Sequence, residues 1–258
     1  DVPMLIWCLC PFASALANGQ TVFDGLSESV VVLTTWGLPY FFGRIYFNDP
    51  AGLRELAIGL VIAGLIYVPF CLWEARMSPQ LHRTVYGYSP APFMHHKRYE
   101  GFRPMVFMHS GLMVGMWMAS AALMCLWLRI SGSLKRLAGL PLELWLGALI
   151  VVAVICKTAL AIGLLLVGIL GLLTARWFRS SLPVAMLMAL VVGYIGLRAT
   201  SLWDAQELVE FSAWLIDDSR AQSLSFRLEN EDRLAAHAMQ RPMFGWGFWG
   251  RSRVTDVL

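Results

Sequence analysis

The chain has 258 residues, of which 58% are hydrophobic and 14% are charged, and its formal charge at pH 7 is +3. Soluble domains carry about 25% charged residues, so this composition excludes an ordinary soluble domain and predicts a polytopic membrane protein. The net charge is too small to indicate binding to nucleic acid. The five cysteines lie in or beside apolar runs, where a disulfide framework or a zinc site is not expected.

The apolar runs predict an all-α fold with about seven membrane spans, because a crossing helix needs about 20 apolar residues. The run 56–73 contains no charged residue, and 105–128 contains only His109, so these two spans are the clearest. Residues 141–175 are too long for one helix and are interrupted by Lys157, which predicts a tight helical hairpin. The predicted spans are 2–17, 27–47, 55–74, 105–128, 141–156, 158–175 and 182–200.

The distribution of Lys and Arg predicts the orientation of these spans. The short loops 129–140 and 176–181 are basic, and basic short loops favour the cytoplasmic side. Alternation then puts the loop 75–104 and residues 201–258 outside the cytoplasm. We therefore predict two domains: residues 1–200 form a transmembrane helical bundle with an extracytoplasmic loop at 75–104, and residues 201–258 form an extracytoplasmic amphipathic, helical segment.

The loop 75–104 is itself basic, which conflicts with the charge rule if that loop lies outside. Either the orientation is inverted, or these cations bind an anionic ligand; we favour the second interpretation because inversion would misplace both other basic loops. The adjacent histidines have no carboxylate or cysteine close by, so a metal site is not expected. The basic side chains and histidines are Arg76, His82, Arg83, His95, His96, Lys97, Arg98 and Arg103.

Two arginines in the polar tail share one helical face. Arg220, Ser223 and Arg227 are spaced i, i+3 and i+7, and two guanidiniums so placed suit phosphate oxygens. The alternative is that they are surface arginines that pair with nearby acids. Those acids are Asp217, Asp218, Glu229 and Glu231.

Three further features need an explanation. In Arg241-Pro242-Met243-Phe244-Gly245-Trp246-Gly247, proline ends a helix and the glycines permit positive φ. Lys157 interrupts an apolar stretch, so it is either functional or extends to the lipid headgroups from a helix end. Gly111-x-x-x-Gly115 predicts close helix packing. His109 and His237 are expected to be packing or surface residues.

Taken in order along the chain, these features resemble the O-antigen ligase and O-antigen polymerase superfamily over residues 145–250. The resemblance rests on Cys156-Lys157-Thr158-Ala159 opening an apolar helix, a second span, Arg220 and Arg227, and then Pro242-x-x-Gly245-x-Gly247. Upstream, residues 39–44 and the loop from Glu74 to Pro104 also look like the ligase branch.

The chain departs from that family pattern in two places. Cys156 and Ala159 replace the commoner small polar residue and glycine. The family's histidine, with a glycine eleven positions later, would lie beyond Leu258, and His237 does not match it. The catalytic residue is therefore unknown, and we expect the sequence to be a fragment of a longer membrane protein.

The resemblance implies a metal-independent bacterial glycosyltransferase without a cofactor, located in the inner membrane with its active face in the periplasm. Such an enzyme takes a glycan from a polyprenyl diphosphate, such as undecaprenyl diphosphate, and transfers it to lipid A-core in a ligase or to another lipid-linked glycan in a polymerase. By position, the diphosphate ligands would be Arg220, Arg227, Lys157 and Arg103. The turn motif would be Pro242, Gly245 and Gly247.

Two other classes of protein remain open. Intramembrane charges and helix breaks at Pro39, Pro69 and Pro183 would suit a transporter or flippase, although the sequence has no internal repeat. In a structural membrane subunit, Arg220 and Arg227 would only pair with acids.

Overall fold

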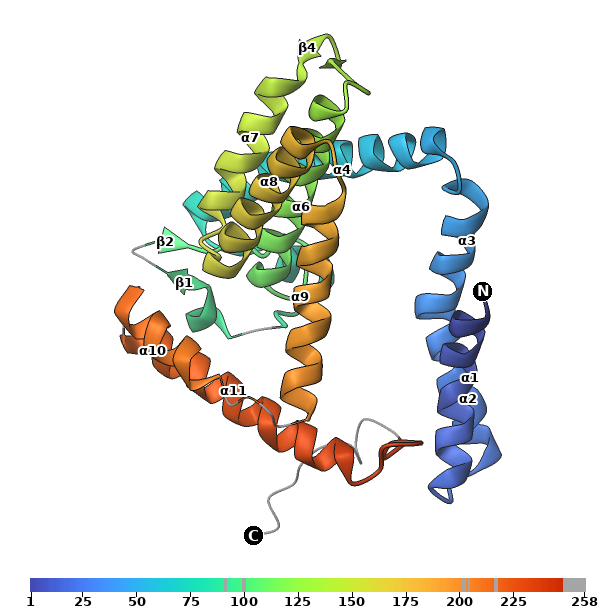
Figure 1. The fold of residues 1–258 in the computed structure, drawn as a ribbon. Helices are drawn as coiled ribbons and strands as arrows, with labels where there is room; N and C mark the ends of the chain where they lie inside the picture. The colour runs from blue at the N-terminus through green and yellow to red at the C-terminus, as the bar shows by residue number, and fades with distance from the viewer. Residues whose placement is uncertain (91, 99–100, 201–202, 204, 216–217, 248–258) are drawn as a thin grey trace. The chain divides into compact units, whose positions relative to one another are not determined.

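The computed structural model describes residues 1–258 except 91, 99–100, 201–202, 204, 216–217 and 248–258 (Figure 1). Residue contacts divide the chain into two compact units. Unit 1 comprises Asp1–Ile45 and Met188–Leu258, and unit 2 comprises Tyr46–Leu187. Helices make up most of the described residues in both units, which confirms the predicted all-α class.

Unit 2 is a helical bundle built around α6 (Gly111–Ile130). This helix packs against α4 (Pro50–Met77), α7 (Leu142–Ile155) and α8 (Ala159–Phe178), and Figure 1 shows α6, α7 and α8 side by side. The buried side chains of the core come from all four of these helices, and α8 contributes Ala161 and Leu165. Examples are Val61, Met118, Cys125, Leu128 and Leu149.

Local sequence signals set the ends of these helices. Asp49 caps α4 by accepting the N–H of Gly52 at 2.7 Å, and Pro50 occupies the first turn, where its missing N–H costs nothing. Ser110 caps α6 by accepting the N–H of Met113. The predicted hairpin around Lys157 is confirmed, since α7 ends at Ile155 and α8 begins at Ala159.

The loops of unit 2 gather at two opposite ends of the bundle. The Arg103 end consists of the described residues of 78–110 and of 156–158. It contains α5 (Leu81–Tyr86), η2 (Phe93–His96) and the antiparallel pair β1 (Lys97–Arg98) and β2 (Gly101–Phe102). The Arg176 end consists of residues 131–141 and 176–181, with the antiparallel pair β3 (Arg136–Leu137) and β4 (Leu140–Pro141).

Side-chain bonds connect the loops within each end. Arg103 donates to Thr158 at one end, and Arg176 donates to the carbonyl of Ile130 at 2.6 Å at the other. The loop 75–104 and Lys157 therefore share one end, and the basic loops 129–140 and 176–181 share the other, as the alternation predicted. Which end faces the cytoplasm stays a prediction.

Unit 1 contains a helical hairpin and the polar tail. The hairpin joins α1 (Val2–Ala17) to α2 (Val22–Val32), and α2 continues through the π-helix η1 (Leu33–Gly37) into α3 (Leu38–Tyr46). Gly25 lets α1 and α2 approach, because a side chain there would lie 3.0 Å from Phe12. The tail follows α9 (Leu182–Ala199) and forms α10 (Gln206–Leu215), which packs against α11 (Asp218–Met239).

Four helices within the described residues are long and apolar enough to cross a membrane: α4, α6, α8 and α9. They indicate a multi-pass membrane protein, but the predicted seven spans are not confirmed. With 14 residues, α7 is about 21 Å long, which is shorter than a hydrocarbon core of about 30 Å. The predicted span 27–47 is divided among α2, η1 and α3. The predicted domain boundary at residue 200 stays a prediction.

Close packing of α4 on α6 generates the first testable prediction. A side chain at Gly64 would place its Cβ 2.5 Å from the Cβ of Ala121, whereas Gly59 on the same helix has no atom within 4 Å of that position. We expect Gly64→Val to lower the free energy of unfolding by about 1–3 kcal/mol through overpacking. Thermal unfolding in detergent measures this, with Gly59→Val as the matched control; equal losses in the two variants would contradict the packing.

Candidate functional site

A buried carboxylate organises the Arg103 end of unit 2. Glu74, in the last turn of α4, is fully buried. Its Oε1 accepts the N–H of Leu81 at 2.8 Å, and its Oε2 accepts those of Met105 at 2.8 Å and Val106 at 2.7 Å. Hydrogen bonds from amides stabilise a buried charge that would otherwise be very costly. The carboxylate therefore holds both the start of α5 and the segment before α6 against the end of α4.

The segment held by Glu74 also presents Arg103. Arg103 donates to Thr158 Oγ1 through Nη2 at 2.8 Å and through Nε at 3.2 Å, and its own N–H bonds to the carbonyl of His96 at 2.7 Å. Thr158 is buried at the start of α8. These bonds fix a half-buried guanidinium beside the turn between α7 and α8.

The two glycines of the Gly111-x-x-x-Gly115 motif make room for this arrangement. A side chain at Gly111 would lie 2.7 Å from Arg103 Cγ, and one at Gly115 would lie 2.7 Å from Thr158 Oγ1. The predicted close helix packing is thus found only at Gly115, against the N-cap residue of α8, whereas Gly111 packs against the loop that carries Arg103. This packing brings Arg103 and Thr158 onto α6.

Lys157 reaches the same place from the other side of the turn. Its backbone has φ of 50°, a left-handed conformation that is rare for a residue with a side chain. Its Nζ lies so close to Gly101 of β2 that a side chain at that glycine would collide with it. Lys157 directly precedes Thr158, the residue that Arg103 binds, so both predicted diphosphate ligands are held at the same turn. We call Arg103, Lys157 and Thr158 the Arg103–Lys157 site.

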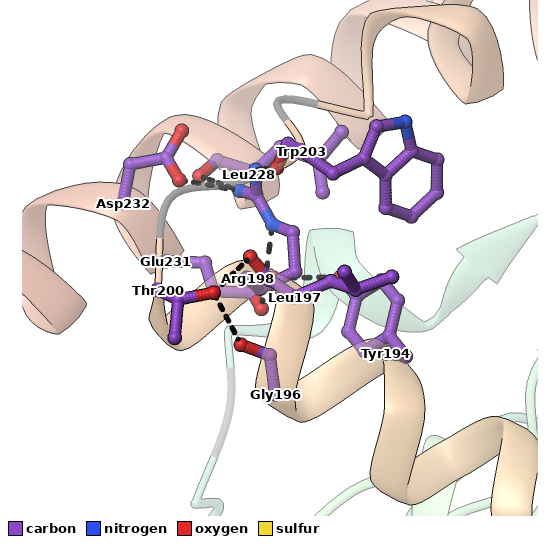
Figure 2. A network of polar contacts seen from close by, with 9 residues as sticks. All are labelled: Tyr194, Gly196, Leu197, Arg198, Thr200, Trp203, Leu228, Glu231 and Asp232. Carbon is purple, nitrogen blue, oxygen red and sulfur yellow. Dashed lines mark hydrogen bonds and ion pairs between the residues drawn. The ribbon is translucent and has the colours of Figure 1, made fainter.

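In unit 1, a buried arginine attaches α11 to α9 (Figure 2). Arg198, in the last turn of α9, has 3% of its surface exposed. Its Nη2 lies 2.7 Å from Asp232 Oδ1 and donates to the carbonyl of Leu228 at 3.1 Å, and its Nε lies 3.7 Å from Glu231 Oε1. One guanidinium therefore contacts three residues of a single face of α11.

Two aromatic residues complete this network. Tyr194 donates its hydroxyl proton to Glu231 Oε2 at 2.9 Å, and its ring packs edge-on against Trp203 (Figure 2). The carbonyl of Trp203 accepts from Arg198 Nη1 at 3.0 Å. The segment between α9 and α11 is thereby held by the same arginine.

This attachment determines how α11 presents Arg227. Leu228 and Ala221 are buried, whereas Arg227, one position away, is exposed. Arg220 and Arg227 both belong to α11, so their i, i+7 spacing puts them on one face, although the side chain of Arg220 lies outside the described residues.

Two of the acids that could pair with Arg227 are bound to other residues. Glu231 contacts Arg198 and Tyr194, and Glu229 accepts a hydrogen bond from Ser225 at 3.2 Å. In the part of α11 whose side chains are described, Arg227 forms no ion pair. Asp217 and the side chain of Asp218 lie outside the described residues.

The turn after α11 has the predicted backbone. Gly245 has φ of 65° and Gly247 has φ of 87°, and α11 ends at Met239, just before Pro242. The ring of Trp246 stacks on His237 with 4.2 Å between centroids and donates to its carbonyl. The turn is therefore fixed onto the end of α11.

The other face of this turn contacts the end of α1 within unit 1. Asn18 donates to the carbonyl of Gly245 at 3.1 Å, and Arg241 donates to the Asn18 side chain. Arg241 also lies over the Trp246 ring, 4.3 Å from its centroid. Pro242, Gly245 and Gly247 thus form an ordered turn, and their role in a transfer reaction stays a prediction.

Within the units as described, the predicted residues form two groups. Arg103 and Lys157 are held at the same turn of unit 2. In unit 1, Arg220 and Arg227 share α11, and the glycine turn follows that helix. The residues that sequence reasoning missed are Glu74, Thr158 and Arg198. An ionisable side chain within an apolar helix is a candidate functional residue. Glu74 and Arg198 could therefore have been singled out from the sequence.

Comparison with protein-family models, with curated proteins and with solved structures found no match for this chain. The resemblance to O-antigen ligases and polymerases therefore stays a prediction.

The amide bonds to Glu74 generate a second prediction. Glu74→Gln leaves one acceptor oxygen, so at least one of the three bonds is lost, and a bond to a charged group is worth about 1.5–3 kcal/mol. We expect at least tenfold faster hydrogen exchange at the amides of Leu81, Met105 or Val106. Exchange measured by mass spectrometry tests this, with the exposed Glu55→Gln on the same helix as the control. Unchanged protection in Glu74→Gln would contradict the organising role of the carboxylate.

The attachment of α11 generates a third prediction. Arg198→Gln removes the cation that contacts both Glu231 and Asp232. We expect amide exchange in residues 221–239 to rise about tenfold or more, because α11 separates from α9 more often. Arg233→Gln, at an exposed position on the same helix, should leave exchange unchanged. Equal protection in both variants would show that Arg198 does not hold α11.

Proposed function

We propose that this protein transfers a glycan from a polyprenyl diphosphate to a lipid acceptor at the periplasmic face of a bacterial inner membrane, as an O-antigen ligase does with lipid A-core. The observation that supports the proposal most is that two cations are held at the turn between α7 and α8, at one end of an apolar helical bundle: Arg103 through Thr158, and Lys157 beside Gly101. Cations fixed at the end of membrane helices suit a ligand whose charge lies at the headgroup level and whose tail lies in the bilayer.

Membrane topology supports a joint role for the two groups of cations. If α9 crosses the membrane, as its length allows, the chain after Ala199 emerges on the side opposite the Arg176 end. That is the side of the Arg103–Lys157 site. In this proposal Arg227 and Arg220 of the polar tail are further candidate ligands of the diphosphate.

The reaction is a displacement at the anomeric carbon. The acceptor hydroxyl oxygen forms a bond to that carbon, the bond from the carbon to the diphosphate oxygen breaks with its electron pair, and the hydroxyl proton passes to a base. Negative charge builds on the diphosphate as it leaves. Arg103 and Lys157, held in place before the reaction, would stabilise that charge in the transition state. No residue is assigned as the base.

Two other functions fit the same cations. A polymerase would use the same donor with a second lipid-linked glycan as acceptor, and a flippase would move the carrier without breaking the glycosidic bond. The destination of a label on the glycan separates them, so one assay tests all three.

The fourth prediction concerns this assay. The protein is reconstituted in liposomes with labelled polyprenyl-diphosphate glycan, lipid A-core and a chelator. We expect label on the lipid A-core, and about 100-fold slower transfer for Lys157→Gln, Arg103→Gln or Arg227→Gln, because each removes a charge that stabilises the leaving group. Lys135→Gln, at the Arg176 end, is the control and should transfer normally.

The other outcomes of this assay are also informative. A ladder of longer lipid-linked chains would show a polymerase. Label that stays on its carrier but changes leaflet would show a flippase. Label that never leaves the carrier or its leaflet would contradict the proposed function.

A further inference from the structure

An apolar groove runs along the half of unit 2 that is nearest the Arg176 end. It has a volume of about 480 Å³ and is lined by side chains of α4, α6, α8 and the first turns of α9. The lining is apolar throughout, and it includes Leu56, Leu60, Trp127, Gly168, Leu172 and Leu187. The volume falls within the range of about 300–1,000 Å³ that is usual for ligand pockets.

The position of the groove determines where an occupant comes from. It lies between α4, α6, α8 and α9, the helices that are long and apolar enough to cross a membrane. Such a surface faces hydrocarbon, so an occupant enters from the bilayer and presents an apolar chain. The glycines keep the groove open, since a side chain at Gly171 would lie 3.0 Å from Leu187 Cδ1.

Two arginines stand where the groove reaches the Arg176 end. Arg54 follows Leu53 of the groove in the first turn of α4, and Arg176 lies one turn beyond Leu172 on α8. Arg54 Nε donates to the carbonyl of Ser133 at 3.0 Å, and Arg176 Nη1 donates to that of Ile130 at 2.6 Å. Both guanidiniums are therefore held beside the same short segment at the end of α6.

These two guanidiniums are suited to a phosphate. A guanidinium has five N–H donors in a fixed fork, so one carbonyl bond leaves donors for another acceptor. Both side chains are exposed. Arg129, by contrast, is paired with Glu143. The net cationic charge at the mouth of an apolar groove favours an anionic headgroup over a zwitterionic one.

We propose that unit 2 binds a glycerophospholipid with an anionic headgroup, with an acyl chain in the groove and its phosphate on Arg54 and Arg176. This site is at the opposite end of α8 from the Arg103–Lys157 site, so it does not depend on the proposed glycan transfer. It differs from ordinary boundary lipid because it selects the headgroup.

Lipid retention tests this fifth prediction. The delipidated protein is mixed in detergent with phosphatidylglycerol or phosphatidylcholine of the same acyl chains, and bound lipid is counted by native mass spectrometry. We expect wild type to bind phosphatidylglycerol at least tenfold more tightly. Arg54→Gln with Arg176→Gln should lose that preference. Lys135→Gln with Arg136→Gln, which removes two exposed cations at the same end, should keep it.

A second variant tests the apolar half of the site. Val184→Trp places a larger side chain at a partly exposed position of the groove, and we expect at least tenfold weaker binding of phosphatidylglycerol. Equal binding of the two lipids by wild type, or an equal loss in the Lys135 and Arg136 control, would overturn the proposal. So would tight, selective binding by Val184→Trp. The comparison of the two lipids on the wild-type protein tests the proposal even if a variant fails to fold.

Discussion

The buried carboxylate of Glu74 is the constraint on which the Arg103 end depends. A charge at the end of a membrane helix must be compensated, and here three backbone amides from two separate segments do so. Those bonds hold residues 105–106 outside the helix that follows, and this non-helical segment presents Arg103 to Thr158. The position of Arg103, which is proposed to bind substrate, thus depends on the carboxylate of Glu74, which accepts hydrogen bonds from backbone amides.

The same physical problem is solved differently in unit 1. Arg198 is a buried cation at the end of an apolar helix, and it is compensated by Asp232, Glu231 and two carbonyls (Figure 2). The carboxylates are partly exposed, so the network faces water on one side. Because α11 is bound through this face, Arg227 lies at its exposed edge, one turn before Glu231. In both units, a buried ionic group fixes an irregular or polar segment that carries an exposed or half-buried cation.

The sequence predicted the helical class, the hairpin at Lys157 and the glycine turn because these depend on local patterns. It misplaced the start of α6, predicted at residue 105, since Val106 has a left-handed φ of 49° and Ser110 is the residue that caps the helix. It treated 27–47 as one span, although a π-helix divides it. Lys157 stood out as a charge in an apolar run. The bond that brings Arg103 to the neighbouring Thr158 is a long-range contact for which Gly111 and Gly115 leave room, and no local pattern could predict it.

The central claim is that the Arg103 end binds a diphosphate. The most direct test is the affinity of a short-chain, water-soluble polyprenyl diphosphate for the purified protein, measured by calorimetry at two salt concentrations. We predict binding that weakens with salt, falls at least tenfold in Arg103→Gln with Lys157→Gln, and is retained in Lys135→Gln with Arg136→Gln. Equal affinity in the two double variants would contradict the claim, because the Arg103–Lys157 site would then contribute nothing specific.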